Sequence, residues 1–391
     1  MYGHVCEGWE KIDPVSSPDL RPQSHCTMRL SDITRVLETW APPVLQEDYD
    51  NSGLQVGSPD KEVKAALVAL DCTEEVVDEA VKRGCDLVIA HHPVIFRGLK
   101  SITGRTGVER TLLAAIKQDV AIYAIHTNLD NVITGVNAEI AARLGLQDVQ
   151  VLDPKPGQLL KLVVFVPNAH AEPVRTAMFS AGAGRVGNYD ECSFGHEGQG
   201  TFRGGEGSNA FVGKKGERHT EPETRIETVL HAPMERAVVQ AMLKAHPYEE
   251  VAYDLYPLAN NHPGIGSGAI GRLPEPLEEA AFLAKVKAAF NVPAIKHTAM
   301  RGKPVERVAL CGGSGAFLIG RAKSAGADAY VTADLKYHEF FGAEGQLLLA
   351  DIGHYESEQF TMHLLQRHLR DKLPTFAAHL TETVTNPVHI C

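Results

Sequence analysis

The stretch Leu87-Val88-Ile89-Ala90-His91-His92-Pro93 decides the architecture that we expect for this chain. Its short, continuous apolar run is typical of a strand buried on both faces of a sheet. The run ends on two adjacent histidines, and neighbouring residues on a strand point to opposite faces. His91 and His92 can therefore serve one pocket only by leaving the strand together. That geometry suits two metal ions with one imidazole each, although an isolated His-His-Pro is more often an ordinary strand end.

Two further apolar runs, residues 65–70 and 120–125, predict neighbouring strands of the same sheet. Helical segments separate the three runs, and apolar strands that alternate with helices form largely parallel sheets covered on both faces. Ligands bind at the carboxyl ends of the strands in such sheets. We therefore expect the histidines that follow these ends to meet in one place. They are His91, His92 and His126.

The chain of 391 residues is long enough for two or three domains. An α/β alternation at each end encloses a strand-helix-strand, strand-helix-strand order, which suggests a ferredoxin-like α+β module. We expect an α/β protein in which two α/β/α lobes form one split domain with this module inserted. The expected divisions are a flexible N-terminal extension (1–27), an N-terminal α/β lobe (28–156), the inserted α+β module (157–258) and a C-terminal α/β lobe (259–391).

Three regions carry more specific expectations. Residues 182–224 are rich in Gly, Ser, Glu and Lys and predict short strands at best. Residues 260–274 are rich in Gly and Pro and predict a joint between modules. A long helix is expected from His354 towards Arg370. The sequence leaves open whether translation starts at Met1 or Met28.

Composition narrows the class of protein. The formal net charge of -11 argues against bulk nucleic-acid binding, because such proteins usually show a basic footprint. The seven cysteines are scattered without a Cys-x-x-Cys pair, which favours reduced thiols in a cytoplasm. No apolar run reaches the roughly 18–20 residues of a membrane span, and the first residues lack the apolar centre of a secretory signal. We therefore expect a cytoplasmic protein with no membrane partner.

A second segment with metal-ligand residue types is His126-Thr127-Asn128-Leu129-Asp130. It follows a predicted buried strand, so its side chains should emerge at the same sheet edge as His91 and His92. Asp130 can bridge two cations with its two oxygens, and His126 is either a ligand or a donor behind the ligands. Taken alone, an Asx-type turn capped by Asn128 or Asp130 explains this segment at least as well.

A third segment is His354-Tyr355-Glu356-Ser357-Glu358. His354 and Glu358 stand four residues apart at a helix start, which places them on one helical face. An imidazole and a carboxylate at that spacing suit a first-row transition metal. For Glu356 we prefer a solvated position that complements the helix dipole.

Three weaker features remain. The turn Gly312-Gly313-Ser314-Gly315 could cradle a phosphate, but it lacks a P-loop lysine, so a tight strand-to-helix turn explains it better. Lys336 and His338 follow another strand end, where contact with an anionic substrate is about as well supported as a surface lysine and a packed histidine. His246-Pro247 is better explained as a turn than as a ligand pair.

Together the three segments predict a centre in which two divalent ions, about 3.5–4 Å apart, share Asp130 or Glu358. Such ions lower the pKa of water and stabilise a developing oxyanion, which is the chemistry of a hydrolase. No side chain is assigned as the catalytic group, because water activated by the metals would react. His126, Lys336 and His338 are candidate groups behind the ligands. Metal identity stays open among Zn, Fe and Mn, since such sites accept each of them.

With these segments, the sequence resembles a known family, the GTP cyclohydrolase I type 2 homologues, also called the NGG-interacting-factor-three-like family. The resemblance runs from about Met28 to Leu369. It rests on Asp50-Asn51-Ser52-Gly53-Leu54-Gln55-Val56-Gly57, Ala90-His91-His92-Pro93, His126-Thr127-Asn128-Leu129-Asp130 and Gly353-His354-Tyr355-Glu356-Ser357-Glu358.

The resemblance carries several implications. It implies two metal ions per chain, a ring-like homohexamer with the metal centres facing an internal cavity, and an insert similar to the trimeric signal-transduction and copper-tolerance proteins. The metal ligands that it implies are His91, His92, Asp130, His354 and Glu358.

Two functions fit these observations. The first is a metal-dependent hydrolase, GTP cyclohydrolase-like or a phosphoesterase, acting on a nucleotide-like or phosphorylated anionic small molecule. The family name suggests opening of the guanine ring of GTP, but no guanine pocket is visible in the sequence. The second is a non-catalytic metal-binding regulatory or scaffold protein whose insert senses a ligand or partner.

Overall fold

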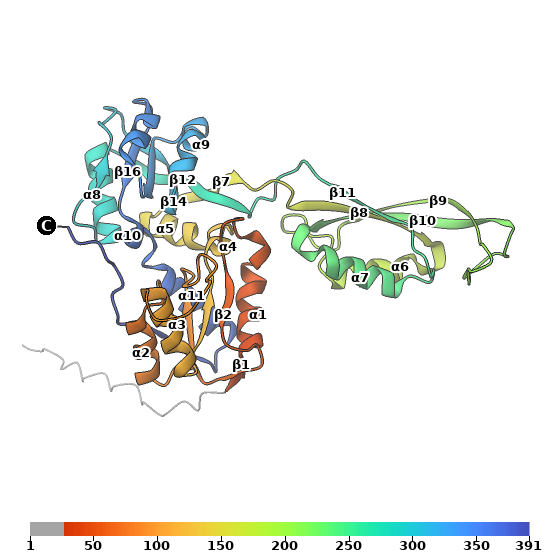
Figure 1. The fold of residues 1–391 in the computed structure, drawn as a ribbon. Helices are drawn as coiled ribbons and strands as arrows, with labels where there is room; N and C mark the ends of the chain where they lie inside the picture. Colours follow the sequence, from red (N-terminus) through yellow and green to blue (C-terminus); the bar gives the residue numbers. More distant parts are fainter. Residues whose placement is uncertain (1–26, 391) are drawn as a thin grey trace, which may run out of the picture.

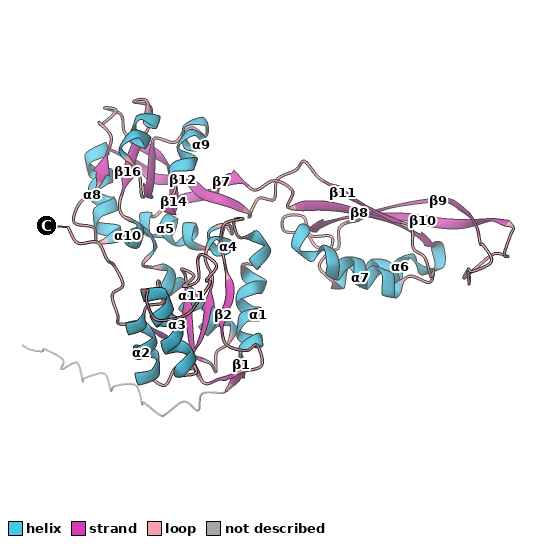
Figure 2. Cartoon of the chain, in the orientation of Figure 1, coloured by secondary structure: helices cyan, strands magenta, loops and turns pink. Residues whose placement is uncertain are grey.

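The computed structural model describes residues 27–390, so the predicted N-terminal extension lies outside the described residues except for Thr27. The described chain forms a body of two lobes, and the elements between Leu159 and Pro257 project from it to one side (Figure 1). Figure 2 shows helices packed beside strands in each of these three parts.

The first lobe is built on a five-stranded sheet with the order β17-β4-β5-β6-β2. The four strands β17 to β6 are parallel, as the alternation predicts, and β2 is antiparallel at the edge. Apolar side chains alternate between the two faces, with Ile89 packed towards α1 and α11, and Val88 towards α2 and α3. The bounds are β2 Gly53–Val56, β4 Ala65–Ala69, β5 Leu87–Ala90, β6 Ala121–Ala124, β17 Ala377–Leu380, α1 Leu30–Trp40, α2 Glu74–Lys82, α3 Gly107–Lys117 and α11 Thr361–Lys372.

The second lobe is built on a mixed six-stranded sheet with the order β13-β16-β15-β14-β12-β7. The expectation of a joint over residues 260–274 is wrong, because strand β12 begins at Gly266. Ala269 and Ile270 on this strand pack on opposite faces of the sheet, which makes it a core strand. The bounds are β7 Gln147–Pro154, β12 Gly266–Leu277, β13 Lys296–His297, β14 Val305–Ser314, β15 Ala329–Ala333, β16 Leu348–Asp351, α5 Val136–Leu144, α8 Glu279–Phe290 and α9 Ile319–Ser324.

One hydrophobic core joins the two lobes. Ile33 and Tyr123 of the first lobe belong to the same cluster of buried side chains as Phe282 and Leu310 of the second. Because protein interiors are close-packed, this shared core holds the ends of the two sheets in one fixed arrangement.

The projecting part is a four-stranded antiparallel sheet with the order β11-β8-β10-β9, and α6 and α7 pack on one of its faces. The expectation of short strands at best over residues 182–224 is wrong. β9 and β10 form a long hairpin through backbone hydrogen bonds, and the exposed side chains of β9 explain why its sequence lacks an apolar pattern. The bounds are β8 Leu159–Pro167, α6 Ala171–Ser180, β9 Ser193–Arg203, β10 Arg218–His231, α7 Glu235–Ala245 and β11 Tyr253–Pro257.

The helix expected from His354 towards Arg370 is two helices, α10 and α11, which break at Gln359 and Phe360. The break places the Phe360 ring 3.2 Å from the guanidinium carbon of Arg143. The remaining elements are short. They are β1 Met28–Arg29, η1 Pro43–Leu45, β3 Glu62–Val63, α4 Thr127–Asp130, η2 Asn168–His170, η3 Ala232–Met234, η4 Ala316–Leu318, η5 Tyr337–Ala343 and α10 His354–Glu358.

Across residues 27–390, no helix is both long and apolar enough to cross a membrane.

The chain after β17 is tied to α2 by one carboxylate, which makes a testable contribution to stability. Glu79 accepts hydrogen bonds from the hydroxyls of Thr381 and Thr383 and from the backbone of Glu382. Glu79→Ala should lower the free energy of unfolding by about 2–3 kcal/mol, since each such bond contributes about 1 kcal/mol. Urea unfolding measures this loss, and Asp78→Ala on the same helix is the matched control, expected to change it by less than about 0.5 kcal/mol.

The same contribution should depend on pH. Burial opposes the charge of Glu79, but the hydroxyl bonds outweigh burial and lower its pKa from 4.5 to about 2. A lowered folded-state pKa stabilises the fold above the unfolded value and ceases to do so as the pH falls through the folded value. The stability difference between wild type and Glu79→Ala should therefore narrow between about pH 4.5 and about pH 2. A difference that stays constant over that range would contradict this assignment.

Candidate metal centre

The histidines singled out in the sequence meet between the two lobes. His91 and His92 directly follow β5, and His126 follows β6 and leads into α4, which ends on Asp130. From the second lobe, the turn after β16 leads into α10, which carries His354 and Glu358. Every one of these side chains stands at the carboxyl end of a strand or on the short helix that follows it, as expected for ligand sites in α/β sheets.

The turn before α10 requires a glycine. Gly353 has a φ of 91°, a conformation that side chains with a Cβ rarely adopt. A Cβ on Gly353 would also collide with the Glu356 carboxylate. The glycine therefore lets the chain turn sharply from β16 into the helix that carries His354 and Glu358.

One group of potential ligands consists of His91, Asp130 and Glu358. The Nε2 atom of His91 lies 3.7 Å from Asp130 Oδ1 and 3.9 Å from Glu358 Oε2. The opposite ring nitrogen, Nδ1, donates to the carbonyl of Ile125 at 2.8 Å, so Nε2 carries a free lone pair. Burial lowers the pKa of His91 to about 3, so the ring stays neutral. His91 Nε2 and Asp130 Oδ1 are buried without a hydrogen-bond partner within residues 27–390.

A second group consists of His92, His354 and Glu358. Glu358 Oε2 lies 3.0 Å from His92 Nε2 and 3.1 Å from His354 Nε2. The two Nε2 atoms are 3.3 Å apart. The same carboxylate oxygen therefore faces both groups, and Glu358 is 3% exposed.

A carboxylate behind each of three imidazoles fixes the orientation of its ring. Asp71 accepts from Nδ1 of His92 at 2.8 Å, and Asp334 accepts from Nδ1 of His354 at 2.7 Å. Such contacts leave Nε2 directed into the cluster, as in carboxylate–histidine–metal arrangements. The sequence reasoning missed Asp71 and Asp334, although an acidic residue just after a buried strand could have signalled both.

The third oriented imidazole is His126. Its Nδ1 lies 2.7 Å from Asp50 Oδ1, and one ring nitrogen lies within 4.8 Å of ligand atoms of His91 and His92. Burial opposes the charge of Asp50, but the hydrogen bonds from His126 and Thr127 outweigh it and lower its pKa well below the usual range. Thus His126 borders the cluster with a fixed ring.

Carboxylates and imidazoles of the cluster change one another's pKa values. Burial disfavours the imidazolium form, but hydrogen bonds with carboxylates outweigh it and raise the pKa of His92 to about 9 and that of His354 to about 11. Burial likewise disfavours the Glu358 carboxylate, but the bonds from His354 and His92 hold its pKa well below the usual range. Burial and the nearby Glu358 charge raise the pKa of Asp130. Nearby positive charge therefore favours the ionised forms of the two buried carboxyl groups, Asp130 and Glu358.

Lys336 and His338 are not part of this cluster. The backbone N–H of Lys336 donates to Glu339 at the start of η5, and the His338 ring packs against Tyr337 and Phe341. Neither side chain lines the hollow beside the cluster.

Two of the weaker motifs have structural roles. Gly312 and Gly313 lie at the end of β14, and their N–H groups are used within the protein, because Gly312 donates to Asn137 and Gly313 to Ser357. His246 contacts the carbonyl of Phe165 through Nε2 and accepts from the Tyr248 N–H through Nδ1.

A hollow of about 870 Å³ opens beside the cluster. His92, His126 and His354 contribute one part of its lining, and apolar side chains contribute most of the rest. The apolar residues are Leu70, Pro93, Phe96, Ala294, Ile295, Ile352, Pro387, Val388 and Ile390. The arrangement suits a molecule with a metal-binding group at one end and an apolar or aromatic body.

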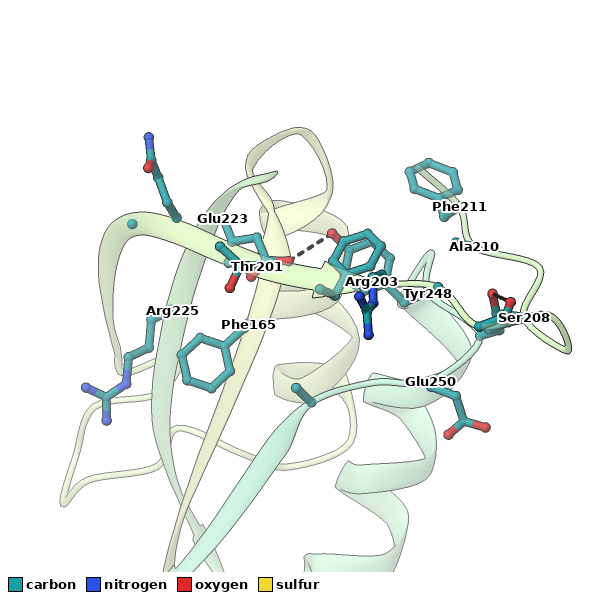
Figure 3. A pocket seen from close by; sticks show the side chains of 18 of the residues that line it. Phe165, Thr201, Arg203, Ser208, Ala210, Phe211, Glu223, Arg225, Tyr248 and Glu250 are labelled. Carbon is teal, nitrogen blue, oxygen red and sulfur yellow. Dashed lines mark hydrogen bonds between the residues drawn. The ribbon is translucent and has the colours of Figure 1, made fainter. Parts of the chain in front are cut away.

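A second hollow, of about 610 Å³, lies in the projecting part (Figure 3). Its lining includes Phe165, Phe211, Arg203 and Glu223, and the Tyr248 hydroxyl donates to Glu223 at 2.8 Å. Among the described residues, the groups of three or more potential metal ligands all lie at the interlobe cluster and not here. Metal chemistry is therefore expected between the lobes.

A substitution at Gly313 tests how tightly the surrounding chain encloses Glu358. Its φ is 60°, and a Cβ there would collide with Glu358 Oε1. Gly313→Ala should therefore lower the free energy of unfolding by about 2–4 kcal/mol. Gly345→Ala is the matched control, because Gly345 has a φ of 67° and open space around its Cβ position. Urea unfolding should show a clearly smaller loss for the control, and equal losses would mean that Glu358 is loosely held.

Comparison with known proteins places this geometry in a family. The model of the family Duf34/NIF3 (NGG1p interacting factor 3) matches residues 28–387. A GTP cyclohydrolase 1 type 2 homolog of Halalkalibacterium halodurans is 42% identical over 363 residues, which cover 91% of this chain and 96% of that protein. The Bacillus subtilis protein of the same name is 39% identical over 361 residues, with coverages of 91% and 96%.

Solved structures agree with this placement. A Bacillus cereus protein described as related to NIF3 superposes with a TM-score of 0.81 at 40% identity, and the match covers 93% of this chain and 99% of that one. Staphylococcus aureus protein SA1388 superposes with a TM-score of 0.74 at 28% identity, with the same coverages. This chain therefore belongs to the Duf34/NIF3 (NGG1p interacting factor 3) family.

Proposed function

We propose that the interlobe cluster holds two divalent metal ions. His91 and Asp130 would bind one ion, His92 and His354 the other, and Glu358 both. The observation that carries this proposal is the pair of buried atoms, His91 Nε2 and Asp130 Oδ1, that have no hydrogen-bond partner within residues 27–390. Buried polar atoms are normally paired, and a cation facing both would satisfy them. Imidazoles and carboxylates suit Zn, Fe or Mn, and Asp71 and Asp334 behind His92 and His354 are of the kind that tune such ligands.

The function that this centre supports best is metal-dependent hydrolysis of a nucleotide or another phosphorylated small molecule. Bound divalent ions would lower the pKa of water and stabilise developing negative charge on the substrate. The protein's own residues orient the metal ligands and exclude water from the site. Asp71 and Asp334 hold their imidazole rings, and Phe96 and Ile295 keep water away from one side of the hollow. With Nδ1 held by Asp50, His126 can accept or release a proton at Nε2.

The names of the relatives support a guanine nucleotide as one substrate to test, since they are called GTP cyclohydrolase 1 type 2 homologs. The remaining expectations are also proposals. They are a homohexamer, a cytoplasmic location, and an inserted module at residues 157–258 between lobes at residues 28–156 and 259–391. These lobe bounds follow the order of the chain only, because β7 pairs within the sheet of the second lobe and β17 within the sheet of the first. The strand order β11-β8-β10-β9 with two helices on one face supports a ferredoxin-like assignment for that module.

A second candidate function is a metal-binding regulatory protein whose projecting module senses a ligand. The hollow of about 610 Å³ in that module favours it, because this hollow combines aromatic walls with a largely buried Glu223 (Figure 3). A measurement of hydrolytic turnover distinguishes the two candidate functions, because only the hydrolase should turn over a substrate.

Elemental analysis tests the metal centre. Protein purified under mild conditions should contain two divalent ions per chain. Asp130→Ala and His354→Ala should each retain about one ion, and Glu358→Ala should lose both, since the Glu358 carboxylate faces both groups. His338→Ala is the matched control, because this exposed histidine lies outside the hollow, and it should retain both ions. Less than one ion in the wild type, or two in Glu358→Ala, would contradict the proposal.

Turnover tests the chemistry. Protein loaded with Zn, Mn or Fe should hydrolyse at least one member of a panel of GTP and phosphoesters. His92→Ala should lower the rate at least about 100-fold, because one metal would lose a ligand, whereas His338→Ala should leave it unchanged. Absence of metal-dependent turnover, or equal turnover in His92→Ala, would favour the regulatory alternative.

A further inference from the structure

The last described residues cross from one lobe to the other beside the candidate metal centre. After β17, residues 381–390 run from the first lobe towards α10 of the second (dark blue in Figure 1). We call this segment the strap. Its start is anchored, because the hydroxyls of Thr381 and Thr383 both donate to Glu79 on α2.

In the middle of the strap, Thr385 reaches the metal-ligand side of the first lobe. Its hydroxyl donates to Asp71 Oδ2 at 2.6 Å, and the other oxygen of Asp71 accepts from His92 Nδ1 at 2.8 Å. One oxygen of Asp71 thus accepts a hydrogen bond from the strap, and the other accepts one from the imidazole of His92. A carboxylate held at both ends cannot turn away from the ring, so Thr385 fixes the direction of His92 through Asp71.

The next residue reaches the other lobe. Asn386 Nδ2 donates to Glu356 Oε1 at 2.9 Å, and Glu356 belongs to α10, which also carries His354 and Glu358. Of two consecutive strap residues, one therefore contacts the carboxylate behind His92 in the first lobe, and the other contacts the helix that carries His354 and Glu358 in the second. This placement distinguishes the strap from a chain end that merely packs on one surface.

Beyond these contacts, the strap forms a wall of the hollow beside the cluster. Pro387, Val388 and Ile390 all line it, together with Ile295 and Phe96 from the lobes. Val388 is 63% exposed and Ile390 55% exposed, so both offer apolar surface to a molecule that enters. Burial of apolar surface of the ligand against such residues is favourable because it removes that surface from water.

We propose that the strap has two roles at the centre: Thr385 positions the metal ligand His92 through Asp71, and Val388 and Ile390 select substrates with an aromatic or apolar group beside the metal-binding group. This inference rests on the proposed metal centre, but not on hydrolysis. Its tests use metal affinity and binding of an inert probe, so they stand apart from the turnover experiment.

The first test measures cobalt affinity by competition with a chromophoric chelator and by the visible absorption of bound Co²⁺. Thr385→Val keeps the side-chain shape and removes the hydroxyl. It should lower the affinity for one of the two Co²⁺ ions about 10-fold and shift the visible absorption of that ion. Hydrogen bonds to a metal ligand from residues behind it typically contribute 10–100-fold in affinity. Thr385→Ser should restore both values. Thr383→Val, which removes a hydroxyl bond to Glu79 two residues away, is the matched control and should leave both ions unchanged.

Equal affinities in Thr385→Val and wild type would overturn the positioning role. An equal loss in Thr383→Val would also overturn it, since that result would show a general effect of loosening the strap.

The second test uses phenylphosphonate and methylphosphonate, which share a metal-binding phosphonate and resist hydrolysis. Calorimetry on the metal-loaded protein should show tighter binding of the phenyl compound by at least about fivefold, as expected for partial burial of a ring. Val388→Asn and Ile390→Asn, which remove apolar surface without adding charge, should remove this preference and leave methylphosphonate binding within about twofold. The exposed strap residue Val384, which does not line the hollow, gives the control Val384→Asn. No preference in the wild type, or a preference that survives both substitutions, would overturn the selective role.

Discussion

The buried carboxylate of Glu358 is the interaction on which the rest of the centre depends. Removing a carboxylate from water costs several kcal/mol unless other groups compensate its charge. Glu358 is 3% exposed, and its Oε2 atom lies 3.0 Å and 3.1 Å from the Nε2 atoms of His92 and His354. His91 Nε2 lies 3.9 Å from the same oxygen. One oxygen therefore brings together imidazoles from both lobes, and the geometry of the cluster follows from its need for positive charge.

The surrounding fold keeps this charge in place. The first lobe contributes His91 and His92 from a strand end, and the second contributes Glu358 from a short helix after another strand. The two lobes share one hydrophobic core, so the strand ends cannot slide past each other without disturbing close packing. Rigid elements hold a site more exactly than loops do, and this site stands on strand ends and on helix α10. At the edge of this site, the strap adds one hydrogen bond to each lobe.

The sequence predicted much of the site, because ligand chemistry is local in the chain. Adjacent histidines after a buried run, and His354 with Glu358 on one helical face, were visible as patterns, and the structure brings these residues together. Other features depend on contacts between distant residues. Asp71 and Asp334 orient histidines 21 and 20 residues away. Their place after a buried strand could have marked them as candidates, but the sequence does not show which histidine each one contacts. Strand β9 lacked an apolar pattern because its side chains are exposed. Lys336 follows the same strand as Asp334, but it starts η5 and does not line the hollow.

Anomalous diffraction tests the central claim most directly. Crystals grown with Zn or Mn and measured at the absorption edge of that metal should give two peaks per chain, about 3.5–4 Å apart. Both peaks should contact the Glu358 carboxylate, with His91 and Asp130 at one and His92 and His354 at the other. A single peak that does not contact Glu358, or no peak between the lobes at full metal loading, would contradict the account.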